Sequence, residues 1–175
     1  MVVLETERLI LRSVAEQDAA VMLDYRSNEI CAKYQHGQTK EPDGISRLIE
    51  RRKNDTVSAD HPFMLAAALK QSNLMIGEIV VMPENGTTII MGYTFHYNYH
   101  RRGYAYEALT ALTNLLHERY PLWNFICYTE PENAASIALL KKLGYHDMGY
   151  LPDRKARAFG RWTAPAAEAD TAEIK

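Results

Sequence analysis

The residues best suited to chemistry form a short basic turn in the middle of the chain. Arg101 and Arg102 precede Gly103, and a segment with helical periodicity follows directly. The start of a helix leaves four backbone N–H groups without partners and carries partial positive charge. None of these three side chains can accept a hydrogen bond and so cap the helix. A phosphate group would fill that role, so the turn predicts an anion-binding site, with a plain solvated turn as the alternative.

This anion site depends on a strand before the turn and a helix after it. Residues 87–95 begin with a β-branched run and then alternate around Gly92, which is typical of a strand where glycine marks a bulge or a close backbone approach. Across residues 105–116, apolar residues recur every three or four positions, as on one face of a helix. The stretch is neither a Walker loop nor a three-glycine dinucleotide fingerprint.

The stretch resembles motif A of the GNAT superfamily of N-acetyltransferases, whose signature is Q/R-x-x-G-x-G/A after a bulged strand. The match runs from His100 to Ala105, with His100 where the family usually has glutamine or arginine. The continuation GYAYEAL, with Asn133-Ala134-Ala135-Ser136 and Leu143-Gly144-Tyr145, is similar to the RimJ/RimL-type ribosomal-protein-alanine branch. The resemblance implies the GNAT fold of class α/β, a mixed, mostly antiparallel sheet with splayed central parallel strands, flanked by helices.

The order of the predicted elements, β-α-α-β-β-β-α-β-α-β-β, agrees with that fold. We expect a single acetyltransferase domain over residues 1–162 and a flexible tail over 163–175. The segment 1–14 is predicted as one half-exposed strand, and 29–41 as a loop. By resemblance, the helices on either side of this loop form one wall of the acceptor groove. The other predicted strands are 62–69, 74–82, 87–95, 123–129, 145–151 and 158–162, and the helices are 15–28, 44–54, 105–116 and 133–144.

The resemblance implies acetyl-CoA as the cosubstrate and no metal. The pantetheine arm would lie against the peptide groups of Phe95, His96 and Tyr97, much as an added β-strand would. Asn133 and Ser136 would also contact the coenzyme, although Asn133 could be only a helix cap and Ser136 only a first-turn residue. The pyrophosphate would lie on the backbone amides of Arg101, Arg102, Gly103, Tyr104, Ala105 and Tyr106.

Acetyl transfer to an amine sets three chemical requirements. The amine must be neutral, the developing oxyanion needs a hydrogen-bond donor, and the departing thiolate is helped by a proton. Binding both substrates in line supplies much of the rest, so no covalent enzyme intermediate is needed. A backbone N–H near Tyr97 is the expected oxyanion donor. By resemblance to RimJ/RimL-type enzymes, Ser136 is the expected acid, because Leu140 stands where many superfamily members have a tyrosine.

Four side chains are candidates for the general base. His96 ranks first, because an imidazole titrates near neutral pH and this one lies at the end of the strand. Glu78 ranks second, with pairing to a solvent-facing neighbour as the alternative. Tyr97 and Glu130 are further candidates, and a base relayed through water is a further alternative. The chain departs here from the RimL-type pattern, which has acidic residues at the positions of His96 and Tyr97.

Composition narrows the range of partners. A chain of 175 residues that is 47% apolar suits one α/β domain, and its net charge of −2 gives no reason to expect nucleic acid or an anionic membrane. The sequence has no apolar run of eighteen residues and no signal-peptide pattern, so we expect a cytoplasmic protein. Cys31 and Cys127 are expected to be buried thiols. Four histidines lack metal-ligand spacing and are expected at the surface or as satisfied polar residues: His36, His61, His117 and His146.

Together these observations predict an acetyl-CoA-dependent N-acetyltransferase that acts on a primary amine, either a protein N-terminus or a small amine. The alternative is a non-catalytic acyl-CoA-binding or sensor module of the same fold, because the family's tyrosine and base are missing. A nucleic-acid binder using Arg101 and Arg102 is a weaker alternative, opposed by the net acidity. An exposed last strand would allow a homodimer to form across a twofold axis.

Overall fold

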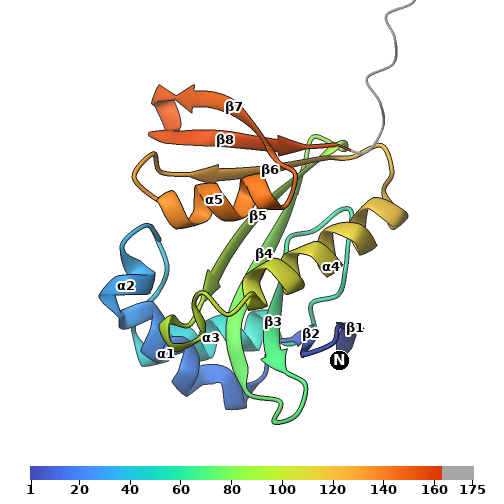
Figure 1. The fold of residues 1–175 in the computed structure, drawn as a ribbon. Coiled ribbons are helices and arrows are strands. Elements are labelled where there is room, and N and C mark those ends of the chain that lie inside the picture. The colour runs from blue at the N-terminus through green and yellow to red at the C-terminus, as the bar shows by residue number, and fades with distance from the viewer. Residues whose placement is uncertain (163–175) are drawn as a thin grey trace, which may run out of the picture.

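Figure 1 shows the computed structural model, which describes residues 1–162 and is built on one eight-stranded sheet. The predicted tail 163–175 lies outside the described residues. The strand order is β1-β2-β3-β4-β5-β6-β8-β7, and β5–β6 is the parallel pair. The strands are β1 (Val2–Glu5), β2 (Leu9–Ser13), β3 (Phe63–Leu69), β4 (Met75–Glu84), β5 (Thr88–Phe95), β6 (Asn124–Thr129), β7 (His146–Leu151) and β8 (Ala156–Arg161).

Helices cover both faces of the sheet. Successive residues of a strand point to opposite sides, and both sides carry apolar residues that the helices bury. On one face, Leu109 and Leu112 of the central helix α4 pack in the same buried cluster as Ile79 of β4. On the other face, Met22 and Ile45 of the N-terminal helices form a second buried cluster. The helices are α1 (Ala19–Ser27), α2 (Glu29–Ala32), α3 (Pro42–Arg52), α4 (Tyr104–Arg119) and α5 (Ala134–Lys142).

The sheet splits between its two parallel strands. β5 pairs with β4 along its whole length, from Thr88 to Phe95. With β6 it pairs only at residues 88–90, and the two strands then diverge, as Figure 1 shows. The predicted splayed central strands are thereby confirmed. Beyond Ile90, the edge of β5 that faces β6 has no strand neighbour within the described sheet.

The N-terminal prediction of one half-exposed strand over residues 1–14 is wrong. The segment forms the hairpin β1–β2, and nearly every side chain of β2 is buried. Arg12 of β2 is only 6% exposed, and its Nη1 lies 2.7 Å from Oδ2 of Asp18. Sequence alternation could not reveal this, because a buried charge is tolerated only when tertiary contacts supply a partner.

Three further expectations differ from the structure. The segment 29–41 was expected to be a loop but contains α2. Gly92 marks neither a bulge nor a close approach, because β5 pairs with β4 without a register shift and no atom lies within 4 Å of a Cβ built at this glycine. The close approach is at Gly77, where a Cβ would lie 2.7 Å from the ring of Phe95. The last strand, β8, is an inner strand between β6 and β7, so it offers no free edge for a dimer.

The two cysteines are buried free thiols, as predicted. Burial raises the pKa of Cys31, and it raises the pKa of Cys127 to about 12. Neither thiol therefore has the character of an activated nucleophile. Over the described residues, no helix has the length and apolar character needed to cross a bilayer.

His117 of α4 departs from its prediction because it is buried against Phe125, with ring centroids 4.0 Å apart. Neither ring nitrogen has a hydrogen-bond partner among the described residues. Burial, helped by the charge of Arg161, lowers the pKa of His117 from 6.5 to about 4. Between about pH 6.5 and 4, His117 is therefore protonated in the unfolded chain but neutral in the folded protein. The free energy of unfolding should fall as the pH drops through this window.

Denaturant unfolding between pH 7 and 4 would measure this loss. In His117→Phe the titrating group is absent, so part of the pH dependence should disappear. An unchanged dependence in that variant would refute the assignment to His117.

Candidate active site

The basic turn leads into a helix whose N-terminus no side chain caps. Gly103 is the N-cap residue of α4 and has a φ of 83°, in the left-handed region, where a non-glycine residue costs about 1–2 kcal/mol. Arg101, with a φ of 59°, also adopts this conformation. Left-handed residues in turns build the concave sets of backbone N–H groups that bind anions. This uncapped start agrees with the sequence analysis.

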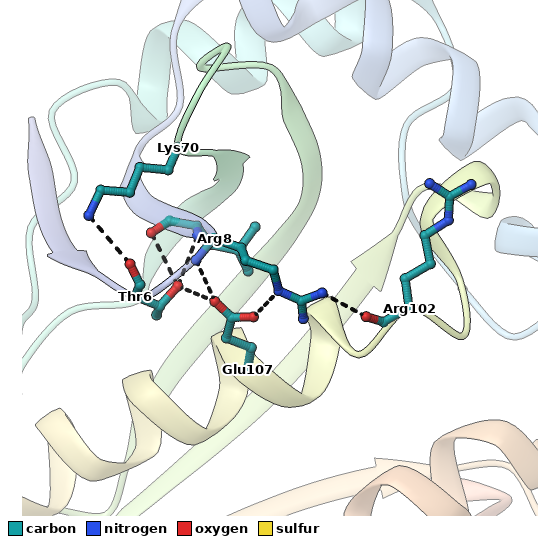
Figure 2. Close-up of polar contacts among 6 residues, drawn as sticks. Thr6, Arg8, Lys70, Arg102 and Glu107 are labelled. Atoms are coloured by element: carbon teal, nitrogen blue, oxygen red, sulfur yellow. Dashed lines mark hydrogen bonds and ion pairs between the residues drawn. The ribbon is translucent and has the colours of Figure 1, made fainter.

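A carboxylate in the first turn of α4 fixes this helix start to the β1–β2 turn, as Figure 2 shows. Glu107 Oε1 accepts hydrogen bonds from Thr6 Oγ1 at 2.6 Å and from the Arg8 backbone at 2.8 Å, and Arg8 Nε donates to Oε2 at 2.7 Å. Burial by itself would raise the pKa of Glu107, but these hydrogen bonds outweigh it and lower the pKa. Arg8 Nη1 also donates to the Arg102 carbonyl at 3.0 Å. Hydrogen bonds from Arg8 thus connect the turn of residues 101–103 to the β1–β2 hairpin.

Several cations surround the helix start. Arg8 Nη2 would lie 3.3 Å from a Cβ at Gly103, and its guanidinium lies over the Tyr104 ring at 4.3 Å. Lys142 of α5 lies over the Tyr106 ring at 4.4 Å. The sequence analysis did not identify Arg8 as a site residue. The acidic Glu107 in the first turn of the predicted helix is a signal that a cationic partner could lie nearby.

Side chains engage the backbone carbonyls along the free edge of β5. The carbonyl of Tyr93 accepts from Gln35 Nε2 at 3.1 Å. The carbonyl of Phe95 bonds His100 Nε2 at 2.7 Å and Cys31 Sγ at 3.3 Å. His100 therefore closes the turn after β5. The pantetheine contacts expected at Phe95, His96 and Tyr97 stay a prediction, and a bound arm would share or replace these partners.

His96, the first-ranked base, has both ring nitrogens engaged. Its Nδ1 accepts a hydrogen bond from the backbone N–H of Asn98 at 3.2 Å. In a neutral ring the proton then resides on Nε2, which lies 2.9 Å from Asp24 Oδ2. The ring is also buried, stacked on Tyr97. This arrangement suits His96 to hold Asp24 in place rather than to take a proton from a substrate.

Asp24 is a functional candidate that the sequence analysis missed. Its side chain is 51% exposed, and the Tyr97 hydroxyl donates to it at 3.2 Å in addition to the contact with His96. The carboxylate therefore lies at the end of β5 with room for a further partner. Its position on α1 matched no motif, and only the tertiary structure brings it to residues 96 and 97.

Glu78, the second-ranked base, does not pair with a solvent-facing neighbour. It is 1% exposed and lies 2.7 Å from Arg26 Nη2, and its carboxylate accepts from the Tyr25 hydroxyl at 2.6 Å and Gln38 Nε2 at 2.9 Å. These donors occupy the carboxylate. Another candidate, Glu130, is in contact with the ring of His36.

The start of α5 supplies the predicted acid. Asn133 caps the helix, because its Oδ1 accepts from the backbone N–H of Ser136 at 3.1 Å, and its contact with the coenzyme stays a prediction. The hydroxyl of Ser136 lies 2.8 Å from that of Tyr93 on β5. Leu140 is buried, 1% exposed. The acid role of Ser136 also stays a prediction. Among residues 1–162, no group of three or more potential ligands could hold a metal ion.

Comparisons with known proteins agree with this geometry. The family model described as "Acetyltransferase (GNAT) domain" matches residues 8–146. The "Uncharacterized N-acetyltransferase p20" of Bacillus licheniformis is 30% identical over 92% of this chain and 91% of its own. The RimL ribosomal L7/L12 alpha-N-protein acetyltransferase (apo form) has a TM-score of 0.79 at 14% identity, covering 93% of this chain and 94% of its own.

A GNAT-family acetyltransferase from Bacillus anthracis has a TM-score of 0.77 at 22% identity, covering 91% of this chain and 96% of its own. At such identities the two structural matches show a shared fold. The family model and the p20 relative go further, because they extend over most of the chain. The chain therefore belongs to the GNAT acetyltransferase family, whose cosubstrate is acetyl-CoA.

Proposed function

We propose that this acetyltransferase transfers the acetyl group of acetyl-CoA directly to a primary amine in a ternary complex. The observation that carries the proposal is the split between β5 and β6, which leaves a free strand edge close in sequence to the uncapped start of α4. A strand edge can bind an extended amide-containing arm, and a helix N-terminus can bind a phosphate. The acetyl thioester supplies the acyl group and a thiolate leaving group.

The residues present fit this cosubstrate. The backbone N–H groups at Gly103 to Tyr106 have no side-chain cap, and Arg8, Arg101 and Lys142 add positive charge near them. The Tyr93 side chain points toward Ser136 of α5 on one face of the sheet. His96, directly after β5, lies on the opposite face, where it contacts Asp24 of α1. This separation would place the acid on the coenzyme side and the base on the acceptor side.

For the base we propose Asp24 in place of His96. As the new C–N bond forms, the nitrogen becomes acidic, and a carboxylate within reach can accept its proton and release it to water. His96 and Tyr97 would act as positioning residues that hold the carboxylate.

Asp24→Asn is accordingly expected to lower kcat by about 100-fold, because the amide keeps the shape but cannot accept the proton. Steady-state kinetics with a saturating amine would measure the loss, and acetyl-CoA binding should stay unchanged. The matched control is Glu29→Gln, which removes an exposed carboxylate from the neighbouring α2. Equal kcat values for Asp24→Asn and the parent protein would exclude Asp24 as the base.

The acceptor is proposed to be a protein N-terminus or a small amine. The name of the RimL neighbour describes an enzyme that acetylates a protein α-amine, which favours the first class. A non-catalytic acyl-CoA sensor remains the second candidate, favoured by the occupied ring of His96 and the occupied carboxylate of Glu78.

A titration with acetyl-CoA and free CoA, followed by turnover on a panel of peptides and small amines, tests the proposal. Binding together with acetylation of at least one amine supports it. Binding without acetylation of any amine would favour the sensor, and no binding of either ligand would refute the proposed coenzyme site.

A further inference from the structure

A hydrogen bond between two hydroxyl groups joins β5 to α5 across the split in the sheet. The Tyr93 hydroxyl on β5 lies 2.8 Å from Ser136 Oγ on α5, on the same side as the buried cluster beneath α4. β5 and β6 have already separated at this level, because their pairing ends at Ile90. The pair therefore lies beside the free edge of β5, along which the proposed function places the coenzyme arm. The sequence analysis gave Tyr93 no catalytic role.

The direction of this hydrogen bond follows from acidity. A phenol is a stronger acid than an aliphatic alcohol, so it is the better donor, and the serine oxygen is the better acceptor. When Tyr93 donates to Ser136, the serine keeps its own proton free for a third group. In the reverse arrangement the serine proton would point at the phenol and be lost to any substrate.

Both partners are held in place by other contacts. Ser136 lies in the first turn of α5, where its backbone N–H donates to the Asn133 cap at 3.1 Å. The carbonyl of Tyr93 accepts from Gln35 Nε2 at 3.1 Å, and β5 is paired with β4 at this residue. Burial raises the pKa of Tyr93, so the phenol stays protonated and remains a donor across the working pH range.

We infer that Tyr93 is a positioning residue for thiolate departure, which it supports by directing the Ser136 proton toward the sulfur of the bound thioester. This inference rests on the proposed function. As the C–S bond breaks, its electron pair moves onto sulfur, and the Ser136 hydroxyl donates a hydrogen bond to the charge that develops there. No proton leaves Tyr93. Coenzyme A is released as the thiolate, or the thiolate takes a proton from water.

A double-mutant cycle between Tyr93→Phe and Ser136→Ala tests the inference. Tyr93→Phe is expected to lower kcat about tenfold with an unchanged KM for acetyl-CoA, since one oriented hydrogen bond is lost. Ser136→Ala should lower kcat about 100-fold, because the hydrogen-bond donor to the developing thiolate is lost. In the Ser136→Ala background the tyrosine substitution should have no further effect, because Tyr93 acts only through the serine.

Tyr128→Phe on β6 is the matched control, a partly buried tyrosine whose ring lies beside Arg154, and it should leave kcat unchanged. A purely structural role for Tyr93 would lower kcat by the same factor in both backgrounds, and that result would overturn the inference. So would an unchanged kcat in Tyr93→Phe while the parent protein turns over. If the parent protein acetylates no amine at all, the proposed function falls and this inference falls with it.

Discussion

Replacing Gly103 with glutamate is expected to weaken acetyl-CoA binding at least 100-fold, which corresponds to about 2.8 kcal/mol. Gly103 has a φ of 83° at the N-cap of α4, so any side chain there adopts a strained backbone conformation. A Cβ would stand 3.3 Å from Arg8 Nη2, at the helix start itself. A carboxylate would moreover attract the nearby cations and repel a phosphate. Calorimetric titration with acetyl-CoA and with free CoA measures the effect.

Gly86→Glu is the matched control for this prediction. Gly86 also has a left-handed φ of 70°, in the β4–β5 turn, and a Cβ there would meet no atom within 4 Å. The control therefore includes the backbone strain and the added charge but leaves α4 intact. Its binding should equal that of the parent protein. Retention of binding within about threefold in Gly103→Glu would show that the helix start does not hold the pyrophosphate.

Replacing Glu78 with leucine is expected to lower the free energy of unfolding by about 3–5 kcal/mol. The change leaves the guanidinium of Arg26, which is 4% exposed, buried without its counter-ion, and the Tyr25 hydroxyl loses its acceptor at 2.6 Å. A loss of this size is a large part of the stability of a typical domain, about 5–15 kcal/mol. Denaturant unfolding followed by circular dichroism measures it.

Two companion variants make this prediction specific. The double variant Arg26→Met/Glu78→Leu should regain most of the stability, because an apolar pair of similar volume replaces a buried ion pair at little cost. Asp147→Asn breaks the exposed pair with Arg157 and should cost less than about 1 kcal/mol. If Glu78→Leu were as mild as Asp147→Asn, the buried pair would not be the stabilising element inferred here. Any loss of activity in Glu78 variants has to be corrected for unfolding before it is assigned to catalysis.

Local patterns predicted much of the fold correctly. The helix α4 was foreseen because its apolar residues repeat with helical periodicity. The predicted strands 74–82 and 87–95 are joined, as observed, by a turn in which Asn85 and Gly86 adopt positive φ values of 52° and 70°. The split between β5 and β6 came from the resemblance of the motif. These features depend on short segments, so short segments were sufficient to predict them.

The sequence patterns did not predict which charged side chains are buried. Arg12 and Glu78 both have the residue types of a solvent-facing strand position, yet each is buried with a partner from another element. Whether a charge is exposed or paired depends on which distant residue the fold brings beside it, and no periodicity records that.

The family could be identified from the sequence alone, because motif A is contiguous and the matching family model covers most of the chain. The same stretch predicted the uncapped start of α4, and anion binding there stays a prediction. Which side chains meet around the candidate site depends instead on the packing of distant segments. This packing brings Asp24 to His96, Tyr93 to Ser136, and Arg8 to Glu107. In each of these pairs the partners come from different elements, and their hydrogen bonds exist only once the sheet and helices have packed.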